Sequence, residues 1–551
     1  TSASSALERV EILRIPPEGE TPEGSVQPGK GKRGKRKTIM MNEKWEEQFR
    51  EQIHDFVETI GKFDKGEIDR KAYKGISGGF GSYAQRDPSK HMLRLRMAGG
   101  NLTEKRLEFL TEAVKDYGVE LMKLTTCETV QLHNLKAEQV PVLMEKAIDA
   151  EIYSRGGGGD NPRNIMMSPL SGVQKGEAFD VKPYAEAAAE YLLSIAGEIH
   201  MPRKLKVAFC NGADDSVHSA FRDMGFMANP DGTFTLRIAG GLGGGYKMGV
   251  LVDEHVQVTE ILYYIRAMIE TFCQHGNYEN RAKARTRFMQ ETLGVDGLKT
   301  VFLENVQKMK EKGGLDLHVE EKTVTKKGSG EISDKRVIAQ KQPGLYAVAY
   351  HPIGGCLPAG KPAELLALLK EIPDAECRIA PHETIYIINL TADEAKKVLA
   401  ATADGAQTTF ENSVACIGAS ICQQGVRDSQ VALRAAVAAV REAGIPDGAL
   451  PKICISGCPS SCSAHQAAAL GFQGAAKTVD GKPESAFKMF VGGSDKLGAA
   501  KFGEAGAVIL ERDLPKLLVE LGKAAAASNM NWETWIDGHG DEFRAIVEKY
   551  A

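Results

Sequence analysis

The spacing of hydrophobic and polar residues along the chain predicts a mixture of amphipathic helices and short strands. Apolar residues recur at helical spacing in NEKWEEQFREQIHDFVETIGKF, so we expect folded structure to begin near Asn42 with a helix. Apolar and polar residues alternate in HMLRLRM, residues 91–97, as in a strand that buries one face. Such helical and strand segments follow one another along the chain, which predicts an α/β (α+β) fold.

The same order of elements occurs twice. ETVQLHNL at 128–135 matches ETIYIINL at 383–390, an offset of 255 residues, and Gly99-Gly100 matches Gly354-Gly355 at the same offset. Each copy reads as a strand, a Gly-Gly turn, a helix, a strand and another helix. Agreement in sequence, turn and element order indicates an ancestral duplication.

A second correspondence follows the two copies at a slightly different offset. Residues 200–207 and 449–456 each form a short predicted strand that comes after a helix and contains a proline. The first strand carries lysines, and the second leads into a group of cysteines. A fold with pseudo-twofold symmetry would bring both strand ends to one cleft, where a cofactor fits between a basic wall and a metal cluster.

Size and charge narrow the class of protein. A chain of 551 residues with 42% hydrophobic content can form two to four domains with substantial cores. The net charge of −4 does not favour nucleic acid or an anionic membrane, and no apolar window is long enough for a transmembrane helix. The segment TPEGSVQPGKGKRGKRK has little to bury, which predicts a flexible basic extension over residues 1–41.

Cysteines are the strongest chemical signal in the sequence. Cys416 and Cys422 form a Cys-x5-Cys pair, and Cys458 and Cys462 form a Cys-x3-Cys pair. Four soft thiolates suit a 4Fe–4S cluster, whereas zinc sites usually use tighter pairs such as Cys-x2-Cys. Ten cysteines, five of them between 416 and 462, favour metal or redox chemistry in a reducing compartment, which predicts a cytoplasmic protein.

Together these residues resemble the sirohaem- and 4Fe–4S-dependent sulfite and nitrite reductases, over residues 42–551. The most specific element is Cys-x5-Cys followed by Gly-Cys-Pro-x-x-Cys, which begins at Gly457. The resemblance implies that the four paired cysteines, Cys416, Cys422, Cys458 and Cys462, hold a 4Fe–4S cluster and that Cys462 also bridges to the sirohaem iron. Cys454 lies outside this motif, and we interpret it as a buried structural thiol.

The resemblance also implies an architecture: an internally duplicated sulfite/nitrite reductase fold with three lobes and a pseudo-twofold repeat. The predicted domains are a flexible extension at 1–41, a ferredoxin-like half-repeat at 42–137, a sirohaem and substrate α/β domain at 138–337, a second half-repeat at 338–405 and a 4Fe–4S-binding α/β domain at 406–551.

The family places two arginines and two lysines around the distal face of the haem, where they offset negative charge and deliver protons. The matching residues are Arg94 in HMLRLRMAGG, Arg163 in GDNPRNIMMSP, and Lys204 and Lys206 in MPRKLKVAF, with Arg96 as a second choice for Arg94. Further contacts to the sirohaem carboxylates are expected from Lys123, Gln131, His133, Arg281, Arg285 and Arg287.

One turn departs from the family pattern. The family usually has Thr-Thr-Arg-Gln where this chain has Thr125-Thr126-Cys127-Glu128. Cys127 cannot replace the arginine charge, and Glu128 adds the opposite sign. Cys127 is interpreted as a small buried thiol, with a redox or ligand role as the alternative.

The resemblance implies six-electron reduction of sulfite to sulfide. Sulfite is preferred because plant-type nitrite reductases tend to have asparagine at the position of Lys206; nitrite reduction to ammonia is the alternative. No flavin, nicotinamide or inserted ferredoxin module is visible, so electrons come from a separate ferredoxin or flavoprotein, as in the assimilatory branch. A non-catalytic iron–sulfur relay or binding protein and a zinc-stabilised scaffold remain as other classes.

Overall fold

The computed structural model describes residues 32–551, with side chains described from Trp45 onward. Helix α1 (Lys32–Asp64) begins ten residues before the expected start at Asn42, so the predicted extension is helical over 32–41. The sequence contains no glycine or proline between Gly34 and Gly61, so no helix-breaking residue in this stretch separates 35–41 from the rest of the helix. The rest of the predicted extension, 1–31, lies outside the described residues.

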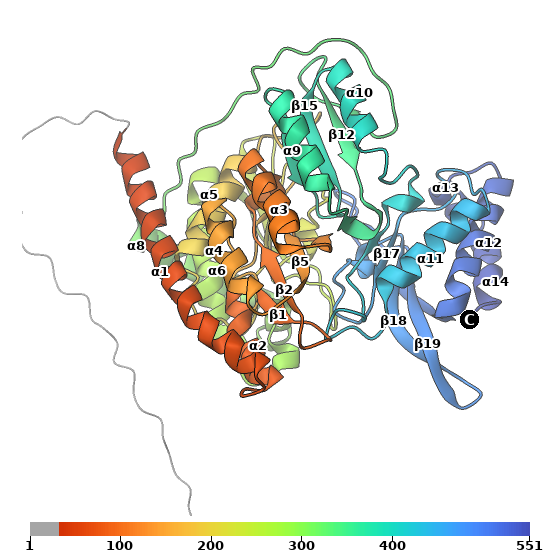
Figure 1. Ribbon diagram of the computed structural model, residues 1–551, viewed down its shortest axis with the longest axis horizontal. Coiled ribbons are helices and arrows are strands. Elements are labelled where there is room, and N and C mark those ends of the chain that lie inside the picture. Colours follow the sequence, from red (N-terminus) through yellow and green to blue (C-terminus); the bar gives the residue numbers. More distant parts are fainter. Residues whose placement is uncertain (1–31) are drawn as a thin grey trace, which may run out of the picture.

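The first half-repeat is a five-stranded sheet with the order β1-β2-β5-β4-β13, in which all neighbours are antiparallel. Strand β2 (His91–Leu95) covers most of the predicted HMLRLRM strand. The helices α1 and α4 pack against each other beside this sheet (Figure 1). The other elements are α2 (Arg70–Ser77), β1 (Ser82–Ala84), α3 (Glu104–Tyr117), β4 (Met122–Leu124), β5 (Val130–Leu135) and α4 (Gln139–Asp149).

The second half-repeat has the matching sheet order β11-β12-β15-β14-β3. Its elements follow in the same sequence as those of the first copy, and its strand β15 holds the ETIYIINL segment that matches ETVQLHNL in β5. The elements are β11 (Val337–Ala339), β12 (Tyr346–Tyr350), α9 (Lys361–Glu371), β14 (Glu376–Ile379), β15 (Ile385–Leu390) and α10 (Ala392–Ala401).

The two half-repeats exchange one short strand each. Strand β3 (Asn101–Leu102) leaves the first copy and pairs with β14 of the second. Strand β13 (Cys356–Leu357) leaves the second copy and pairs with β4 of the first. The buried residues of both sheets accordingly form one continuous hydrophobic core, so neither half-repeat is an independent domain.

Each exchanged strand is directed by the Gly-Gly turn that precedes it. Gly99 and Gly100 have φ of +56° and +66°, and Gly354 and Gly355 have +64° and +68°. A Cβ on Gly99 would lie 2.6 Å from the Met167 sulfur. Both the positive φ and the close packing therefore require glycine here.

Replacing Gly100 by alanine is expected to destabilise the protein by about 2–5 kcal/mol, from a left-handed backbone and a forced contact together. The new Cβ would clash with the carbonyl oxygen of Ile379. Gly118→Ala is the matched control, because Gly118 has φ of +65° but nothing within 4 Å of an added methyl group. Urea denaturation followed by circular dichroism measures both; equal losses would show that the close contact is unimportant.

Two further sheets share one topology. In each, three parallel strands are followed by two antiparallel ones, in the orders β6-β7-β8-β9-β10 and β16-β17-β18-β19-β20. The first sheet comprises β6 (Met166–Met167), β7 (Val207–Cys210), β8 (Met224–Ala228), β9 (Thr233–Ile238) and β10 (Val250–Gln257), with helices α5 (Lys182–Ser194), α6 (Ile261–His275), α7 (Met289–Thr292) and α8 (Gly294–Lys312). The second comprises β16 (Val414–Ala415), β17 (Ile453–Ser456), β18 (Leu470–Val479), β19 (Lys482–Val491) and β20 (Glu504–Leu510), with helices α11 (Ser429–Glu442), α12 (Leu514–Ala527), α13 (Trp532–Gly538) and α14 (Gly540–Glu548).

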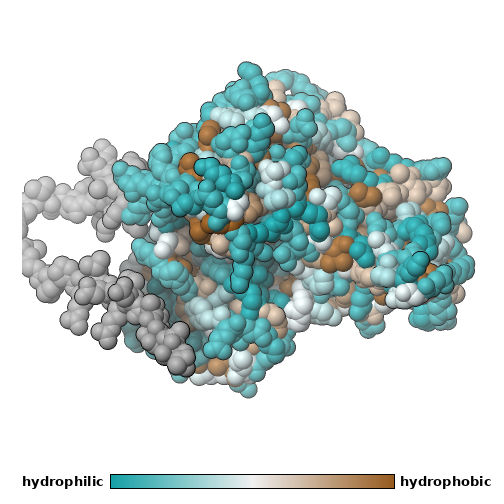
Figure 2. All heavy atoms as spheres, turned by 60° about the horizontal axis from the view of Figure 1, so that its bottom comes forward, coloured by the Kyte–Doolittle hydropathy of each residue, from teal (hydrophilic) through white to brown (hydrophobic). Residues whose placement is uncertain are grey.

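Each of these sheets has its own hydrophobic core. Figure 1 shows α9, α10, β12 and β15 at the top, α11 to α14 with β17 to β19 at the right, and the N-terminal half of the chain at the left. The face shown in Figure 2 is mainly hydrophilic, with apolar residues scattered over it. Within residues 32–551, no helix is long and apolar enough to cross a membrane.

Candidate active site

One cavity of about 340 Å³ lies where the two half-repeats meet both α/β sheets. This volume is typical of sites for small molecules and cofactors. The residues that line it come from β2, from β4 and β5, from the loops after β16 and β17, and from two segments around residues 157–164 and 203–206. Eleven of the predicted site residues are among them: Arg94, Lys123, Gln131, His133, Arg163, Lys204, Lys206, Cys416, Cys422, Cys458 and Cys462.

The two cysteine pairs meet because their strands are parallel neighbours. Strands β16 and β17 pair in register Ala415↔Ile455, and Cys416 and Cys458 follow the carboxyl ends of the two strands. Carboxyl ends of parallel strands lie at one edge of a sheet, where ligands commonly bind. The Cys416 sulfur lies 3.0 Å from the Ser429 hydroxyl and accepts the Gly457 N–H at 3.2 Å.

The four thiols form a connected electrostatic group. Burial, and then the neighbouring Cys416, Cys458 and Cys422, raise the pKa of Cys462 to about 12, against the opposing effect of Lys204. Four thiolates in this space therefore need the positive charge that bound iron supplies, because metal ligands must be deprotonated. The donor set fits a 4Fe–4S cluster held by Cys416, Cys422, Cys458 and Cys462.

The four thiols do not surround a single point in the part of the chain that the structure describes. A zinc ion needs its sulfur ligands about 2.3 Å from one point. Among residues 32–551, no three histidine, cysteine or carboxylate side chains converge in that way. The four thiols line the wall of a cavity instead.

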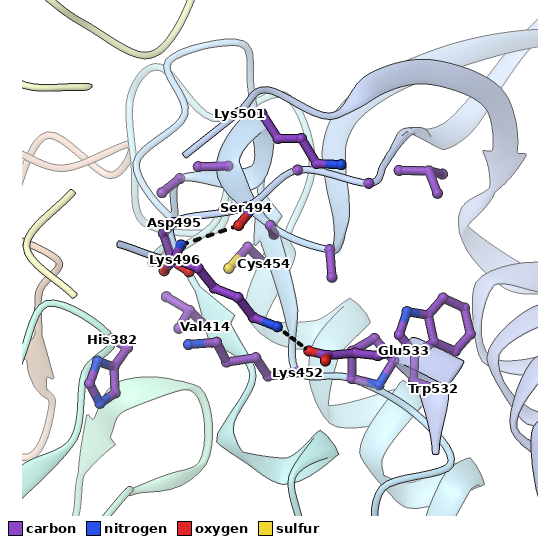
Figure 3. Close-up of a pocket in the computed structure, with 18 of the residues that line it drawn as sticks. His382, Val414, Lys452, Cys454, Ser494, Asp495, Lys496, Lys501, Trp532 and Glu533 are labelled. Atoms are coloured by element: carbon purple, nitrogen blue, oxygen red, sulfur yellow. Dashed lines mark hydrogen bonds and ion pairs between the residues drawn. The ribbon is translucent and has the colours of Figure 1, made fainter. Parts of the chain in front are cut away.

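Cys454 belongs to a different cavity. Its side chain lines a larger space of about 850 Å³ together with Lys452, His382 and Asp495 (Figure 3). None of the four paired cysteines lines this space; all four line the smaller cavity. Burial raises the pKa of the Cys454 thiol to about 12.

The two predicted arginines share one backbone acceptor. Nη1 of Arg94 and Nη1 of Arg163 donate to the Gly157 carbonyl at 2.5 and 2.7 Å. The Nε of Arg163 is buried without a hydrogen-bond partner. Burial, and then the nearby Arg94 charge, lower the pKa of Arg163 to about 10, so the Arg163 guanidinium stays charged at neutral pH.

Arg96, the second choice for Arg94, has a supporting position. Its guanidinium is buried and donates to the carbonyls of Arg155 at 2.7 Å and Arg163 at 3.1 Å. Arg96 thereby fixes the backbone that carries Arg163. Both arginines line the cavity, Arg94 from β2 and Arg96 just after the strand, and only these contacts separate their roles.

Lys204 and Lys206 precede β7 in an extended segment instead of lying within the strand, which begins at Val207. Burial, and then Arg163, Lys206 and Arg285, lower the pKa of Lys204 well below its usual value. The pKa of Lys206 is also lowered, because burial, Arg222 and Arg285 outweigh a thiol at Cys127 that acts in the opposite direction. Such crowded cations are stabilised by an anion bound among them.

His133 and Gln131 connect to Arg94. With the Gln131 amide oriented to satisfy both neighbours, its oxygen accepts from Arg94 at 2.8 and 3.0 Å and its nitrogen donates to His133 Nε2 at 3.1 Å. Burial, and then the charges of Arg94 and Lys123, lower the pKa of His133 to about 3. His133 is therefore neutral and can accept this hydrogen bond.

Lys123 reaches the cavity wall, but it also forms an ion pair with Glu383 of the second half-repeat, and both side chains are only 3% exposed. Glu383 occupies the position that matches Glu128 in the duplication. The sequence analysis assigned the Lys123 charge to a sirohaem carboxylate, whereas in the structure this charge also compensates Glu383.

The predicted arginines of the 281–287 run are dispersed. Arg281 pairs with Asp160 at the surface, and Arg287 donates to the carbonyls of Gly244 and Gly245. Only Arg285 lies close to the site: it binds Asp223 at 2.9 Å and lines a chamber of about 60 Å³ that Lys204, Lys206 and Cys462 also line.

The turn that departs from the family pattern, residues 125–128, contacts the cysteine loop and lines the cavity. The Thr126 hydroxyl donates to the carbonyl of Cys462 at 2.7 Å, and Cys127 lines the cavity. Glu128 is fully buried and accepts the Met167 N–H; burial raises its pKa well above the usual value. Burial therefore opposes the negative charge that the sequence suggests for Glu128.

Two residues that the sequence reasoning missed also belong here. Arg222 is buried and lines the small chamber, and the Tyr83 hydroxyl lies at the cavity and accepts the Gly159 N–H at 2.6 Å. Neither lies in a segment with distinctive spacing, so no signal in the sequence separates them from other buried side chains.

Comparison with known proteins agrees with this architecture. The family described as "Nitrite and sulphite reductase 4Fe-4S domain" matches residues 158–310, and the family described as "Nitrite/Sulfite reductase ferredoxin-like half domain" matches residues 83–150. Through both models the chain is related to the nitrite and sulfite reductases. It is a reductase whose cofactors are sirohaem and a 4Fe–4S cluster, and its internally duplicated α/β fold is confirmed.

Individual relatives cover most of the chain. The chloroplastic ferredoxin–nitrite reductase of Arabidopsis thaliana is 26% identical over 73% of this chain and 71% of its own length. The ferredoxin–nitrite reductase of Synechococcus elongatus is 26% identical over 79% of this chain and 86% of its own length. The structure of the Mycobacterium tuberculosis NirA protein covers 87% of this chain and 92% of its own, with a TM-score of 0.72 and 22% identity, and so shares the fold.

Proposed function

We propose that this protein reduces nitrite to ammonia with electrons from ferredoxin. The observation that carries the proposal is that the four paired thiols line one cavity together with Arg94, Arg163, Lys204 and Lys206. The names of the matched relatives, which are ferredoxin–nitrite reductases, support nitrite as the anion and ferredoxin as the donor. Nitrite takes up six electrons and eight protons to give ammonium and two waters.

Each group of residues has a separate part in this proposal. Cys416, Cys422, Cys458 and Cys462 hold the cluster. Bound together, the cluster and sirohaem supply single-electron transfer and an iron site for the anion. Arg94 and Arg163 orient the oxygens of the anion, since guanidinium groups suit paired oxygen atoms.

Lys204 and Lys206 supply protons as oxygen leaves. Their lowered pKa values suit proton donation, because a general acid works best when its pKa lies near the working pH. Lys123, Gln131, His133 and Arg285 would hold the carboxylates of sirohaem. Arg281 and Arg287 are not assigned a contact with sirohaem in this proposal, and they contribute only positive charge at a distance.

The domain boundaries of the sequence analysis are kept as a proposal, apart from the helical residues 32–41. A reducing, cytoplasmic compartment is also proposed, because all ten cysteines are unpaired.

Sulfite is the second candidate. Lys206 favours it, because the resemblance associates a second lysine with sulfite reductases, and a sequence reading of that position alone placed sulfite first. The names of the relatives outweigh this single position.

The test is a comparison of kcat/KM for nitrite and for sulfite, measured with reduced ferredoxin on the purified holoenzyme. We expect nitrite to exceed sulfite by at least about tenfold, a discrimination that a few charged contacts readily provide. Reduced viologen serves as the control donor, since it separates a poor donor from a poor substrate. A larger kcat/KM for sulfite would reject nitrite as the preferred substrate.

A further inference from the structure

Cys127 is held rigidly at the tip of the turn between β4 and β5. The Glu128 N–H donates to the Thr125 carbonyl at 3.0 Å, which closes the turn, and Glu128 has φ of +55°. The Thr125 hydroxyl accepts the Cys127 N–H at 3.3 Å, and Asn164 Nδ2 donates to the Cys127 carbonyl at 2.9 Å. These bonds fix the backbone on both sides, and the Cys127 side chain lines the candidate active-site cavity.

The charges around the Cys127 sulfur are almost all positive. Lys206 lines the same cavity as Cys127, and its ammonium group acts on the sulfur more strongly than any other cation does. The neighbouring Glu128 carboxyl group is buried, and burial raises its pKa well above the usual value. The cations that act on the sulfur come from four parts of the fold: Lys206 before β7, Arg222 before β8, Arg94 in β2 and Arg163 in the 157–164 segment.

These cations decide the charge of the thiol. Burial by itself raises the pKa of Cys127, but Lys206, Arg222 and Arg94 outweigh it and bring the pKa to about 6. An unperturbed cysteine thiol has a pKa of about 8.5. Cys127 is consequently a thiolate at neutral pH, in the cavity that both lysines of the site also line.

We propose that Cys127 forms an ion pair with Lys206 and thereby acts as a specificity-determining residue that favours singly charged nitrite over sulfite. The thiolate cancels one of the four positive charges around the anion. A site with fewer net charges loses more affinity for an anion that carries up to two charges than for one that carries a single charge. This inference rests on the proposed function, and it accounts for a nitrite preference in a chain that retains the second lysine.

The first test is the change of affinity in the Cys127→Ser holoenzyme. Serine keeps the size of the side chain but stays neutral, so the negative charge that compensates Lys206 is removed from the site. Dissociation constants for nitrite and sulfite are measured by optical titration of the oxidised protein. We expect the ratio of sulfite affinity to nitrite affinity to rise by at least about fivefold, more than an exposed ion pair provides.

Cys273→Ser is the matched control, because Cys273 is another half-buried cysteine but lies on α6, outside the cavity. Its affinity ratio should equal that of the wild type. An unchanged ratio in Cys127→Ser would overturn the proposal. A wild-type protein that prefers sulfite would instead reject the proposed function, whereas the shift caused by Cys127→Ser would still report on the ion pair.

The second test does not depend on either anion. Iodoacetamide reacts with thiolates, so its rate at neutral pH, followed by peptide mass spectrometry, reports the charge of Cys127. We expect Cys127 to react faster than Cys273, whose pKa is raised by burial, and Lys206→Met to slow Cys127 by about tenfold. A Cys127 that reacts no faster than Cys273, or that ignores Lys206→Met, would show that the pair does not exist.

Discussion

Replacing Cys462 by serine is expected to abolish turnover and to remove iron from the protein. Cys462 lines the cavity with the three other paired thiols and interacts electrostatically with all of them. A serine hydroxyl is a hard ligand that replaces a soft thiolate poorly. Because changes in residues that only support metal ligands cost about 10–100-fold, loss of this ligand should lower kcat by more than about 100-fold.

The measurement is kcat with nitrite, together with iron and acid-labile sulfide counts and a visible spectrum. Cys454→Ser is the matched control, because Cys454 lies only four residues before Cys458 but lines the separate cavity of Figure 3. Its iron content and turnover should stay within about twofold of the wild type. If Cys454→Ser lost iron while Cys462→Ser kept it, the proposed ligand set would be wrong.

The second large effect concerns the ion pair that joins the half-repeats. Lys123 in β4 and Glu383 between β14 and β15 are each 3% exposed. Removing one partner of a buried pair leaves the other charge without compensation, which costs about 3–5 kcal/mol. We therefore expect Lys123→Met to lower the free energy of unfolding by that amount, measured by urea denaturation.

Two controls separate burial from charge. Lys370 in α9 and Glu108 in α3 also link the two half-repeats, but their side chains are 51% and 46% exposed, so Lys370→Met should cost less than about 1 kcal/mol. The double variant Lys123→Met, Glu383→Leu should recover most of the loss, since apolar replacements of buried pairs are often neutral. Equal losses for Lys123→Met and Lys370→Met would contradict the expected role of burial.

The same pair gives stability a predictable dependence on pH. Burial, opposed by Lys123, raises the pKa of Glu383 to about 7, above an unfolded value of about 4.3. As pH rises, the unfolded chain loses this proton first, so the contribution of Glu383 to stability is complete below about 4.3 and is lost as pH rises through about 7. Stability relative to Glu383→Gln, whose amide does not titrate, should accordingly fall between pH 5 and pH 8.

Much of the architecture follows from local signals in the sequence. The alternation in 91–97 and the repeated ETV/ETI segments correspond to real strands, and the Gly-Gly matches mark real turns, because side-chain period and glycine freedom are properties of short segments. The start of α1 was placed too late in the sequence analysis. No sharp local signal marks the first residue of the helix between Lys32 and Asn42.

The chemistry of the site could likewise be predicted only in part from the sequence. Cysteine spacing alone indicated a metal cluster, and the order of the basic residues indicated an anion site. Sequence could not distinguish Arg94 from Arg96, which lie on one strand face and differ only in the carbonyl groups that they contact. It also took Cys127 as a neutral thiol and Glu128 as a negative charge, whereas neighbouring cations lower the pKa of Cys127 and burial raises the pKa of Glu128.

The sequence by itself determined the duplication, the element types and the set of thiols and cations available to the site. Tertiary structure alone decided the exchange of β3 and β13, the Lys123–Glu383 pair and the thiolate character of Cys127. Each of these depends on residues far apart in the chain, such as Cys127 and Lys206, becoming neighbours in a space with little water. Charge and pKa are set there by distance and burial, which no local pattern encodes.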